Sequence, residues 1–225
     1  MVNIFERAMS QITLIRHGQA NSDARDEASY DRLSPLGHQQ SKWLGEHLKG
    51  SAAWQGRLFC GTLQRHIETA AAMAPDRTPV QDARLNELEY FTLAELMQDQ
   101  HGLAIPDNRE EFARHMPRVF GAWQRGEIDN PPESFQNFEA RVTSALSDIA
   151  SGDGPALVVT SGGLISMVMR AQLGLDTDNM ARIALAIMNT SMHRLFPIDG
   201  HLSPVLFNAV PHLEHPDRHF AQTHL

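Results

Sequence analysis

Short apolar runs alternate along the chain with longer stretches in which apolar residues recur at helical spacing. Four of these runs are typical of buried β-strands, and two later runs are further strand candidates. The runs are Ile12–Ile15, Arg57–Cys60, Val80–Leu85 and Ala156–Thr160, followed by Met192–Phe196 and Pro204–Phe207. Because the connections between the first four are long enough for helical crossovers, the pattern predicts an α/β fold. We expect a three-layer α/β/α sandwich with a mostly parallel central sheet.

Helix signals fill most of these connections. Ser34 can cap a helix that starts at Pro35, and helical spacing continues from Thr62 to Met73. Further helices are expected across residues 138–149 and 164–173. By contrast, residues 87–130 are polar and aromatic with mixed helical signals, which predicts a small inserted lid. No repeat or linker divides the chain, so we expect a single domain over residues 1–225.

The composition is that of an ordinary globular protein. Of 225 residues, 42% are apolar and 20% are charged, which excludes wholesale disorder. The single cysteine, Cys60, cannot form an internal disulfide, and this predicts a cytoplasmic protein. No apolar run approaches the ~20 residues of a membrane span. The opening MVNIFERAMSQ lacks the basic and apolar regions of a signal peptide.

The net charge indicates which classes of binding partner are unfavourable. It is −8, from 19 basic and 27 acidic residues. This argues against a nucleic-acid partner, because binding to phosphate backbones requires clustered Lys and Arg. A small anionic ligand is still compatible with the charge, since two or three arginines can form a positive pocket in an acidic protein.

The first chemical motif, Arg16-His17-Gly18, directly follows the first predicted strand. In parallel sheets, ligands bind beyond the carboxyl ends of the strands. At such a position His17 could attack an electrophilic phosphorus while Arg16 neutralises the phosphoryl oxygens. Gly18 would let the backbone approach the ligand closely. Taken alone, so short a motif is more often a surface turn.

Two further motifs extend this chemistry. Arg65 stands near the start of the helix after the second strand, where backbone N–H groups also favour anions. Two arginines can hold a phosphate dianion through paired, charge-assisted hydrogen bonds. After the third strand, Glu87 can protonate a departing alkoxide, an effect typically worth ~10²–10⁴ in rate. The neighbouring Glu89 is a rival for that role, and spacing alone does not separate the two.

The order of these motifs resembles that of a known family. The chain reads Leu-Ile-Arg-His-Gly, then Leu-Ser-Pro-Leu-Gly, then Gly-Thr-Leu-Gln-Arg-x-x-x-Thr-Ala, then Leu-x-Glu. Together these motifs resemble the histidine phosphatase superfamily, which includes the cofactor-dependent phosphoglycerate mutases. The resemblance runs from about Ile12 to the predicted strand at His193–Leu195, nearly the whole chain.

This resemblance implies a role for each motif. The histidine that the family phosphorylates corresponds to His17, and the two phosphate-binding arginines correspond to Arg16 and Arg65. The proton donor in the Leu-x-Glu context corresponds to Glu87 rather than to the second glutamate. Asn21 resembles a polar loop residue that often lines the pocket of the family.

One motif departs from the family pattern. Where the family has a second histidine in a Thr-His-Gly-Gly turn, this chain has Ser161. A serine donates one neutral hydrogen bond, about half as strong as a charge-assisted one. Backbone N–H groups of the turn, from Gly162 onward, can still face an anion. Loss of one such donor costs ~10²–10³ in kcat in an unrelated enzyme, so the resemblance implies a slower enzyme.

Two other histidines are candidates to fill the gap, but we interpret both as packing or surface residues. His66 follows Arg65 by one position, and neighbours in a helix point about 100° apart, so we expect His66 to face away from Arg65. His193 lies on a late strand.

Other polar clusters give weaker signals. The histidines near the end of the chain lack metal-ligand spacing, so we expect a solvated tail, no metal site and no cofactor. They are His212, His215, His219 and His224. The arginines at 109, 114, 118 and 125 could contact an anionic substrate, and a solvated helix face explains them equally well.

The sequence therefore leads to one main hypothesis and two rivals. The main hypothesis is a metal-independent phosphomonoesterase that acts on a small phosphorylated substrate through a phosphohistidine intermediate. The first rival is a pseudophosphatase that binds phosphate but has weak or no turnover, because Ser161 replaces the second imidazole. The second rival, a phosphoglycerate mutase, rests on the family resemblance alone.

Overall fold

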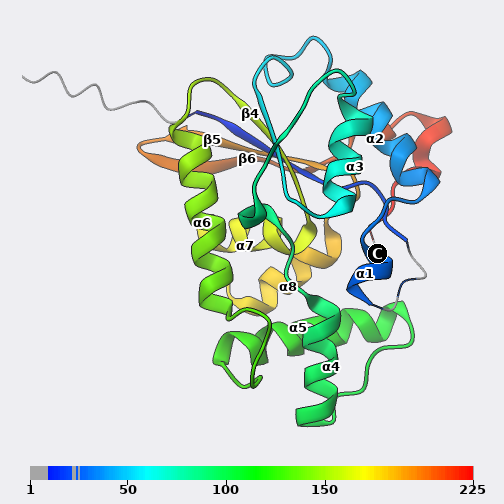
Figure 1. Ribbon diagram of the computed structural model, residues 1–225, viewed down its shortest axis with the longest axis vertical. Coiled ribbons are helices and arrows are strands. Elements are labelled where there is room, and N and C mark those ends of the chain that lie inside the picture. Colours follow the sequence, from blue (N-terminus) through cyan, green and yellow to red (C-terminus); the bar gives the residue numbers. More distant parts are fainter. Residues whose placement is uncertain (1–9, 22–23, 25, 225) are drawn as a thin grey trace, which may run out of the picture.

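A single six-stranded sheet forms the centre of the molecule, in the order β3-β2-β4-β1-β5-β6 (Figure 1). The computed structural model describes residues 10–224 except 22, 23 and 25, so most of the opening segment examined for a signal peptide lies outside the described residues. The strands are β1 (Ile12–Arg16), β2 (Arg57–Cys60), β3 (Val80–Gln81), β4 (Ala156–Thr160), β5 (Met192–Ile198) and β6 (His201–Ala209). Strands β1 to β4 pair in parallel, and the hairpin of β5 and β6 adds an antiparallel edge. The mostly parallel sheet that the sequence predicts is confirmed.

Eight α-helices connect or cover the strands within the described residues. They are α1 (Glu27–Tyr30), α2 (Pro35–Leu48), α3 (Gln64–Met73), α4 (Tyr90–His101), α5 (Arg109–Arg125), α6 (Phe135–Ser151), α7 (Gly162–Leu173) and α8 (Thr177–Ala186). Three short 3₁₀ helices are η1 (Ala83–Leu85), η2 (Pro211–Leu213) and η3 (Pro216–Ala221). As expected, Ser34 caps α2, its side chain accepting from the Gly37 N–H. In the described part of the chain, no helix is long and apolar enough to cross a bilayer.

Alternation along β1 shows why the sheet needs helices on both faces. Successive side chains of a strand point to opposite faces, and all five residues of β1 are buried. Ile12 and Leu14 pack into the core that includes α4 to α8, whereas Ile15 packs into the core formed with α2 and α3. A parallel strand with both sides apolar is stable only when both faces are covered. The three-layer sandwich follows from this requirement.

Between the second and fourth strands the structure corrects one expectation and adds detail to another. The third strand is only Val80–Gln81, because Asp82 caps η1, its carboxylate accepting from the backbone of Arg84 at 2.9 Å. The segment 87–130, expected as an inserted lid with mixed helical signals, holds two regular helices, α4 and α5, which lie below the sheet in Figure 1. Pro117 inside α5 interrupts the helical pattern of the sequence without ending the helix. Apolar residues of both helices belong to the same core as the sheet.

The expectation of a solvated tail is wrong for much of the C-terminal segment. Leu213 is fully buried in a small cluster that packs against Trp43 of α2. His212 is also buried, within 2.9 Å of the Thr190 hydroxyl. The apolar residues of this segment anchor it, whereas His215 and His219 are exposed as expected.

Candidate active site

The turns after β1 and β4 lie side by side at the carboxyl edge of the sheet. The parallel register places Arg16 beside Thr160, and the backbone N–H of His17 donates to the Thr160 carbonyl at 2.8 Å. His17 is therefore adjacent to Ser161, the residue that immediately precedes α7. Two motifs 145 positions apart in the chain thus form one corner of the sheet.

The ring of His17 is held in one orientation. It is 1% exposed, and its Nδ1 lies 2.7 Å from the carbonyl oxygen of Gly18. Because a carbonyl only accepts, Nδ1 carries the proton of the neutral ring, and the lone pair is on Nε2. Within the described residues no group hydrogen-bonds this Nε2. A Cβ on Gly18 would lie 2.4 Å from the Gly37 carbonyl oxygen, so only glycine lets this turn pack against α2.

Burial, above all, keeps the pKa of His17 well below its ordinary value of 6.5. The positive charges of Arg65 and Arg16 lower this pKa further, followed by His66, while the hydrogen bond to Gly18 opposes them. The imidazole is therefore neutral at pH 7, which is the state in which its nitrogen is a nucleophile.

Arg65 enters the site from the first turn of α3 and is oriented by Asp31. The carboxylate of Asp31 accepts from the backbone N–H groups of Gln64 and Arg65, and from the Arg65 guanidinium at 3.0 Å. The Arg65 guanidinium carbon lies 5.0 Å from the ring centre of Tyr30, which in turn meets the His17 ring edge-on. The Nε of Arg65 is buried and has no hydrogen-bond partner within the described structure.

Arg16 extends from the end of β1 toward the C-terminal segment. Its Nη1 donates to the carbonyl oxygens of Ile187 and His224. Its Nε is buried without a partner among the described residues, and a Cβ on Gly162 would lie 3.7 Å from it. Arg16 and Arg65 therefore each keep one buried N–H that an anionic ligand could satisfy. A buried donor without a partner is costly, so a ligand that satisfies it gains affinity.

Glu87 and Glu89, which spacing alone does not separate, have different surroundings. The Glu87 carboxylate accepts from the backbone N–H of Leu88 at 3.0 Å and of Gly163, in the first turn of α7, at 2.9 Å. Glu89 is exposed and accepts from the Thr92 hydroxyl at 3.0 Å. Only Glu87 is thus attached to the turn that lies beside His17, and this favours it as the acid.

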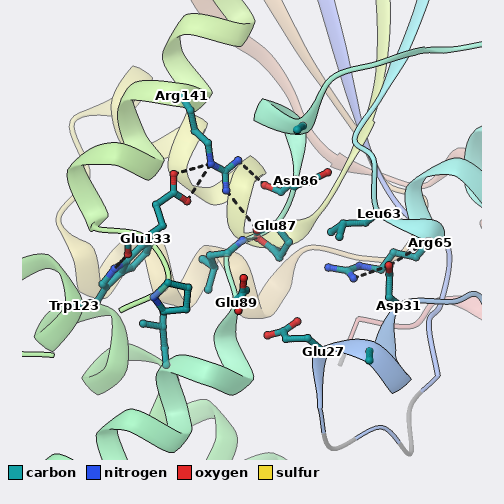
Figure 2. A pocket seen from close by; sticks show the side chains of 15 residues that line it. Glu27, Asp31, Leu63, Arg65, Asn86, Glu87, Glu89, Trp123, Glu133 and Arg141 are labelled. Atoms are coloured by element: carbon teal, nitrogen blue, oxygen red, sulfur yellow. Dashed lines mark hydrogen bonds and ion pairs between the residues drawn. The ribbon is translucent and has the colours of Figure 1, made fainter. Parts of the chain in front are cut away.

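A pocket of about 630 Å³ opens above these groups. Arg65 and Glu87 line it, whereas His17, Arg16 and Ser161 lie outside its lining residues, in the buried layer beneath. Its lining carboxylates belong to Glu27, Asp31, Glu87, Glu89 and Glu133. Figure 2 shows the carboxylates of Glu27, Glu87 and Glu89 gathered between Arg141 on one side and Arg65 on the other. The pocket is therefore more acidic than basic.

The charges of the pocket are not equally available to a ligand. The guanidinium of Arg141 is occupied by the Glu133 carboxylate and by the backbone carbonyls of Arg84 and Asn86. Glu27 forms no ion pair with a described residue, and burial raises its pKa to about 7. The nearby carboxylates also raise that pKa, while a backbone hydrogen bond from Phe91 and the charge of Arg65 oppose the rise.

His66, interpreted from the sequence as a packing or surface residue, is buried against Ser161 at the edge of the site. Its Nε2 lies 2.5 Å from the Oγ of Ser161, and both residues are fully buried. Its ring centre lies 5.8 Å from that of His17. Helical spacing places His66 on a different face of α3 from Arg65, and the fold brings Ser161 against that face. No local pattern in the sequence indicates this contact.

The remaining candidates have simpler surroundings. The Asn21 side chain donates to the Ser29 carbonyl at 3.1 Å, inside the loop before α2, and its contact with a ligand stays a prediction. Gly162 is the first residue of α7. His193 is buried on β5 and lies 2.9 Å from the hydroxyl of Ser191, which fits its interpretation as a packing histidine.

Comparison with known proteins identifies the family. A model of the histidine phosphatase superfamily (branch 1) matches residues 12–210. The chain belongs to the histidine phosphatase superfamily. A glucosyl-3-phosphoglycerate phosphatase from Mycolicibacterium vanbaalenii is 32% identical to it over 180 residues, which are 75% of this chain and 76% of that protein.

The relatives of this chain also include a mutase. A 2,3-bisphosphoglycerate-dependent phosphoglycerate mutase from Tropheryma whipplei (strain Twist) is 33% identical over 132 residues. The match spans about half of each protein, 55% of this chain and 55% of that mutase.

Solved structures share the fold at lower identity. A mutant phosphoserine phosphatase from Entamoeba histolytica, in complex with phosphoserine, has a TM-score of 0.68 at 19% identity and covers 91% of this chain and 100% of its own. Phosphoglycerate mutase from Bacillus anthracis str. Sterne has a TM-score of 0.65 at 19% identity. It covers 92% of this chain and 97% of its own. At these identities the likeness establishes the fold alone.

The buried histidines predict a loss of stability on acidification. Burial lowers the folded-state pKa values of His17, His66, His193 and His212 below 6.5, the last two to about 3. Below pH 6.5 the unfolded chain therefore binds more protons than the folded one. The unfolding free energy is therefore largest above pH 6.5. As the pH is lowered below 6.5, it should fall by up to about 1.4 kcal/mol per pH unit for each histidine.

Urea unfolding at pH 7.5 and 5.5 measures this dependence. In a His193→Gln variant, the unfolding free energy should depend less steeply on pH, because one proton fewer is taken up on unfolding. Equal unfolding free energies of the wild type at the two pH values would contradict the prediction.

Proposed function

We propose that this chain is a phosphomonoesterase that needs no metal ion and acts through a phosphohistidine at His17. The state of the His17 ring carries the proposal. The ring is buried and neutral, its Nδ1 is bonded to Gly18, and its Nε2 has no hydrogen-bond partner among the described residues and lies near the charges of Arg65 and Arg16. The family match and the phosphatase relative support the same class of reaction.

In the first step, the Nε2 of His17 attacks the phosphorus and the bond from phosphorus to the leaving oxygen breaks. Glu87 gives its proton to that oxygen. Arg65 and Arg16 balance the charge of the phosphoryl oxygens, and their Nε–H groups, which have no partner in the described part of the chain, supply donors that are already in place. Donors fixed before the reaction need no reorganisation as charge develops, so positioning and charge supply most of the catalysis.

In the second step, water attacks the phosphorus and the N–P bond to His17 breaks. Glu87 now accepts the proton of the attacking water, and inorganic phosphate leaves. The hydrogen bonds from Leu88 and Gly163 keep the Glu87 carboxylate at the start of α7, within reach of the same oxygen position in both steps. Ser161 and the N–H group of Gly162 add neutral donors at this turn, whereas the N–H of Gly163 is bound to Glu87.

The pocket above the site favours some leaving groups over others. We propose that the segment 87–130, as an inserted lid within a single domain, recognises the leaving group, because several of its residues line the pocket. Glu27 and Glu89 form no ion pair with any described residue, so a leaving group with its own carboxylate would be repelled there. A leaving group that carries an amine would be attracted.

The two rivals make different demands on this site. A phosphoglycerate mutase must bind a substrate carboxylate in the pocket and shield its phosphohistidine from water. The acidic pocket is unfavourable for the first of these (Figure 2). A pseudophosphatase would use the same arginines to bind phosphate with no turnover, so kinetics rather than binding separate it from an enzyme.

The His17→Ala variant tests the proposed function. The wild type should hydrolyse p-nitrophenyl phosphate and form an acid-labile, alkali-stable phosphoenzyme, because phosphohistidine has that stability. In His17→Ala both signals should disappear, since no nucleophile remains. His193→Ala, which removes a second buried histidine, is the control and should keep turnover. Phosphate binding by a wild type that shows no turnover would favour the pseudophosphatase.

The Glu87→Gln variant tests the proton donor through the leaving group. With alkyl phosphates, whose alkoxides need a proton, kcat should fall ~10²–10⁴-fold. With p-nitrophenyl phosphate, whose phenolate leaves without one, the fall should be much smaller. Glu89→Gln serves as the matched control, and its kcat should fall little with either substrate. An equal loss for both substrates in Glu87→Gln would argue against acid catalysis by this residue.

The charge of the pocket predicts a substrate preference that depends on pH. The kcat/KM ratio of phosphoethanolamine to 3-phosphoglycerate should exceed tenfold at pH 8. It should decrease at pH 6, because Glu27, with a pKa of about 7, gains a proton as the pH falls and loses its charge. In Glu27→Gln the ratio should no longer change between these pH values. A preference for 3-phosphoglycerate, together with mutase activity after priming with bisphosphoglycerate, would favour the mutase.

A further inference from the structure

The reaction steps given above use Ser161 only as a neutral donor and give no role to the contact between Ser161 and His66. Ser161 is the N-cap of α7, where a serine side chain ordinarily accepts from a backbone N–H of the first turn. Here it makes no such bond, because the Glu87 carboxylate takes the N–H of Gly163. The Ser161 hydroxyl instead lies 2.5 Å from the Nε2 of His66.

The pair lies against the candidate nucleophile. Ser161 follows Thr160, whose carbonyl accepts from the backbone of His17, and the ring of His66 lies 5.8 Å from that of His17. Space for the His66 ring depends on Gly61, because a Cβ there would lie 2.2 Å from its Nδ1. The chain thus places a buried imidazole and a buried hydroxyl together at the edge of the phosphoryl site.

The surroundings of His66 fix the direction of its hydrogen bond. Burial, and then the charge of Arg65, keep the pKa of His66 well below 6.5, so the ring is neutral and carries one proton. Its Nδ1 is buried and has no partner among the described residues. A buried N–H without a partner is rarer and less favourable than an acceptor without one. The proton is therefore on Nε2, which donates to the Oγ of Ser161.

We infer that His66 is a positioning residue for phosphoryl transfer: its Nε2–H holds the Oγ of Ser161, so the Ser161 hydroxyl donates its own proton to the phosphoryl group. A hydroxyl that already accepts one hydrogen bond is polarised and donates a stronger one. The two residues then act as a unit in place of a single donor. This inference rests on the proposed function of His17.

A double-mutant cycle on the full-length protein tests the unit. Ser161→Ala should lower kcat about 10²-fold, the cost of one lost donor to a charged transition state. His66→Leu, which keeps the buried volume, should lower kcat at least tenfold with a smaller change in KM. Because His66 acts through Ser161, adding His66→Leu to Ser161→Ala should cost less than a further threefold. His66→Gln, whose amide N–H can replace Nε2–H, should recover most of the kcat lost in His66→Leu.

The matched control is another buried serine–histidine pair. The Nε2 of His193 lies 2.9 Å from the Oγ of Ser191, and both residues are fully buried. His193→Leu should therefore lose stability as His66→Leu does, while its kcat stays within threefold of the wild type. Thermal unfolding of each variant separates a loss of fold from a loss of turnover.

Each outcome of the cycle supports or overturns the inference. Full activity in His66→Leu would overturn it. So would a kcat loss in the double variant equal to the product of the losses in the two single variants. If His66→Leu does not fold, His66→Gln and His66→Phe decide: kcat near that of the wild type in His66→Gln with a loss of at least tenfold in His66→Phe supports the inference, and equal kcat values in the two variants overturn it. Absence of His17-dependent turnover in the wild type would instead overturn the proposed function, and this inference with it.

Discussion

The pairing of β1 with β4 is the constraint on which the site depends. Its register places Arg16 beside Thr160, and the hydrogen bond from His17 to Thr160 continues the pairing one residue past the strands. Because both strands are parallel, their carboxyl ends meet at the same edge, and the turns that follow them share one corner. Burial of both faces of these strands by helices holds that corner rigid, and α3 and α7 both start there.

Electrostatics sets the second requirement at this corner. A guanidinium as buried as that of Arg65 needs a counter-charge, and Asp31 supplies it while also binding the start of α3. The neighbouring imidazoles of His17 and His66 are neutral because burial and the arginine charges disfavour a further proton. The result is a site with fixed cations and neutral nitrogen atoms, which suits a dianionic phosphoryl group. The wider pocket has the opposite charge, so the two ends of a substrate meet different environments.

Much of the fold and part of the site could be predicted from local patterns. The strand before Arg16 and the Ser34 cap of α2 depend on neighbouring residues, and the structure has both. Local patterns were weaker in two places, for opposite reasons: they left the helices of segment 87–130 undefined and gave the C-terminal tail as solvated. Pro117 weakens the helical signal of α5, although packing of that helix on the core outweighs the proline. In the tail, the many histidines suggested solvation, but a few apolar residues such as Leu213 anchor it against Trp43.

The sequence by itself determined the order of the motifs and the kinds of side chain available for chemistry: an imidazole, two guanidinium groups and a carboxylate, each after a strand. It also showed that Ser161 stands where an imidazole was expected. Only the tertiary structure decided that His66 faces Ser161 and that Glu87, rather than Glu89, is bound to the start of α7. The physical reason is that helical spacing relates a residue to its own helix, whereas the contacts of α3 and α7 are set by how the sheet brings distant turns together.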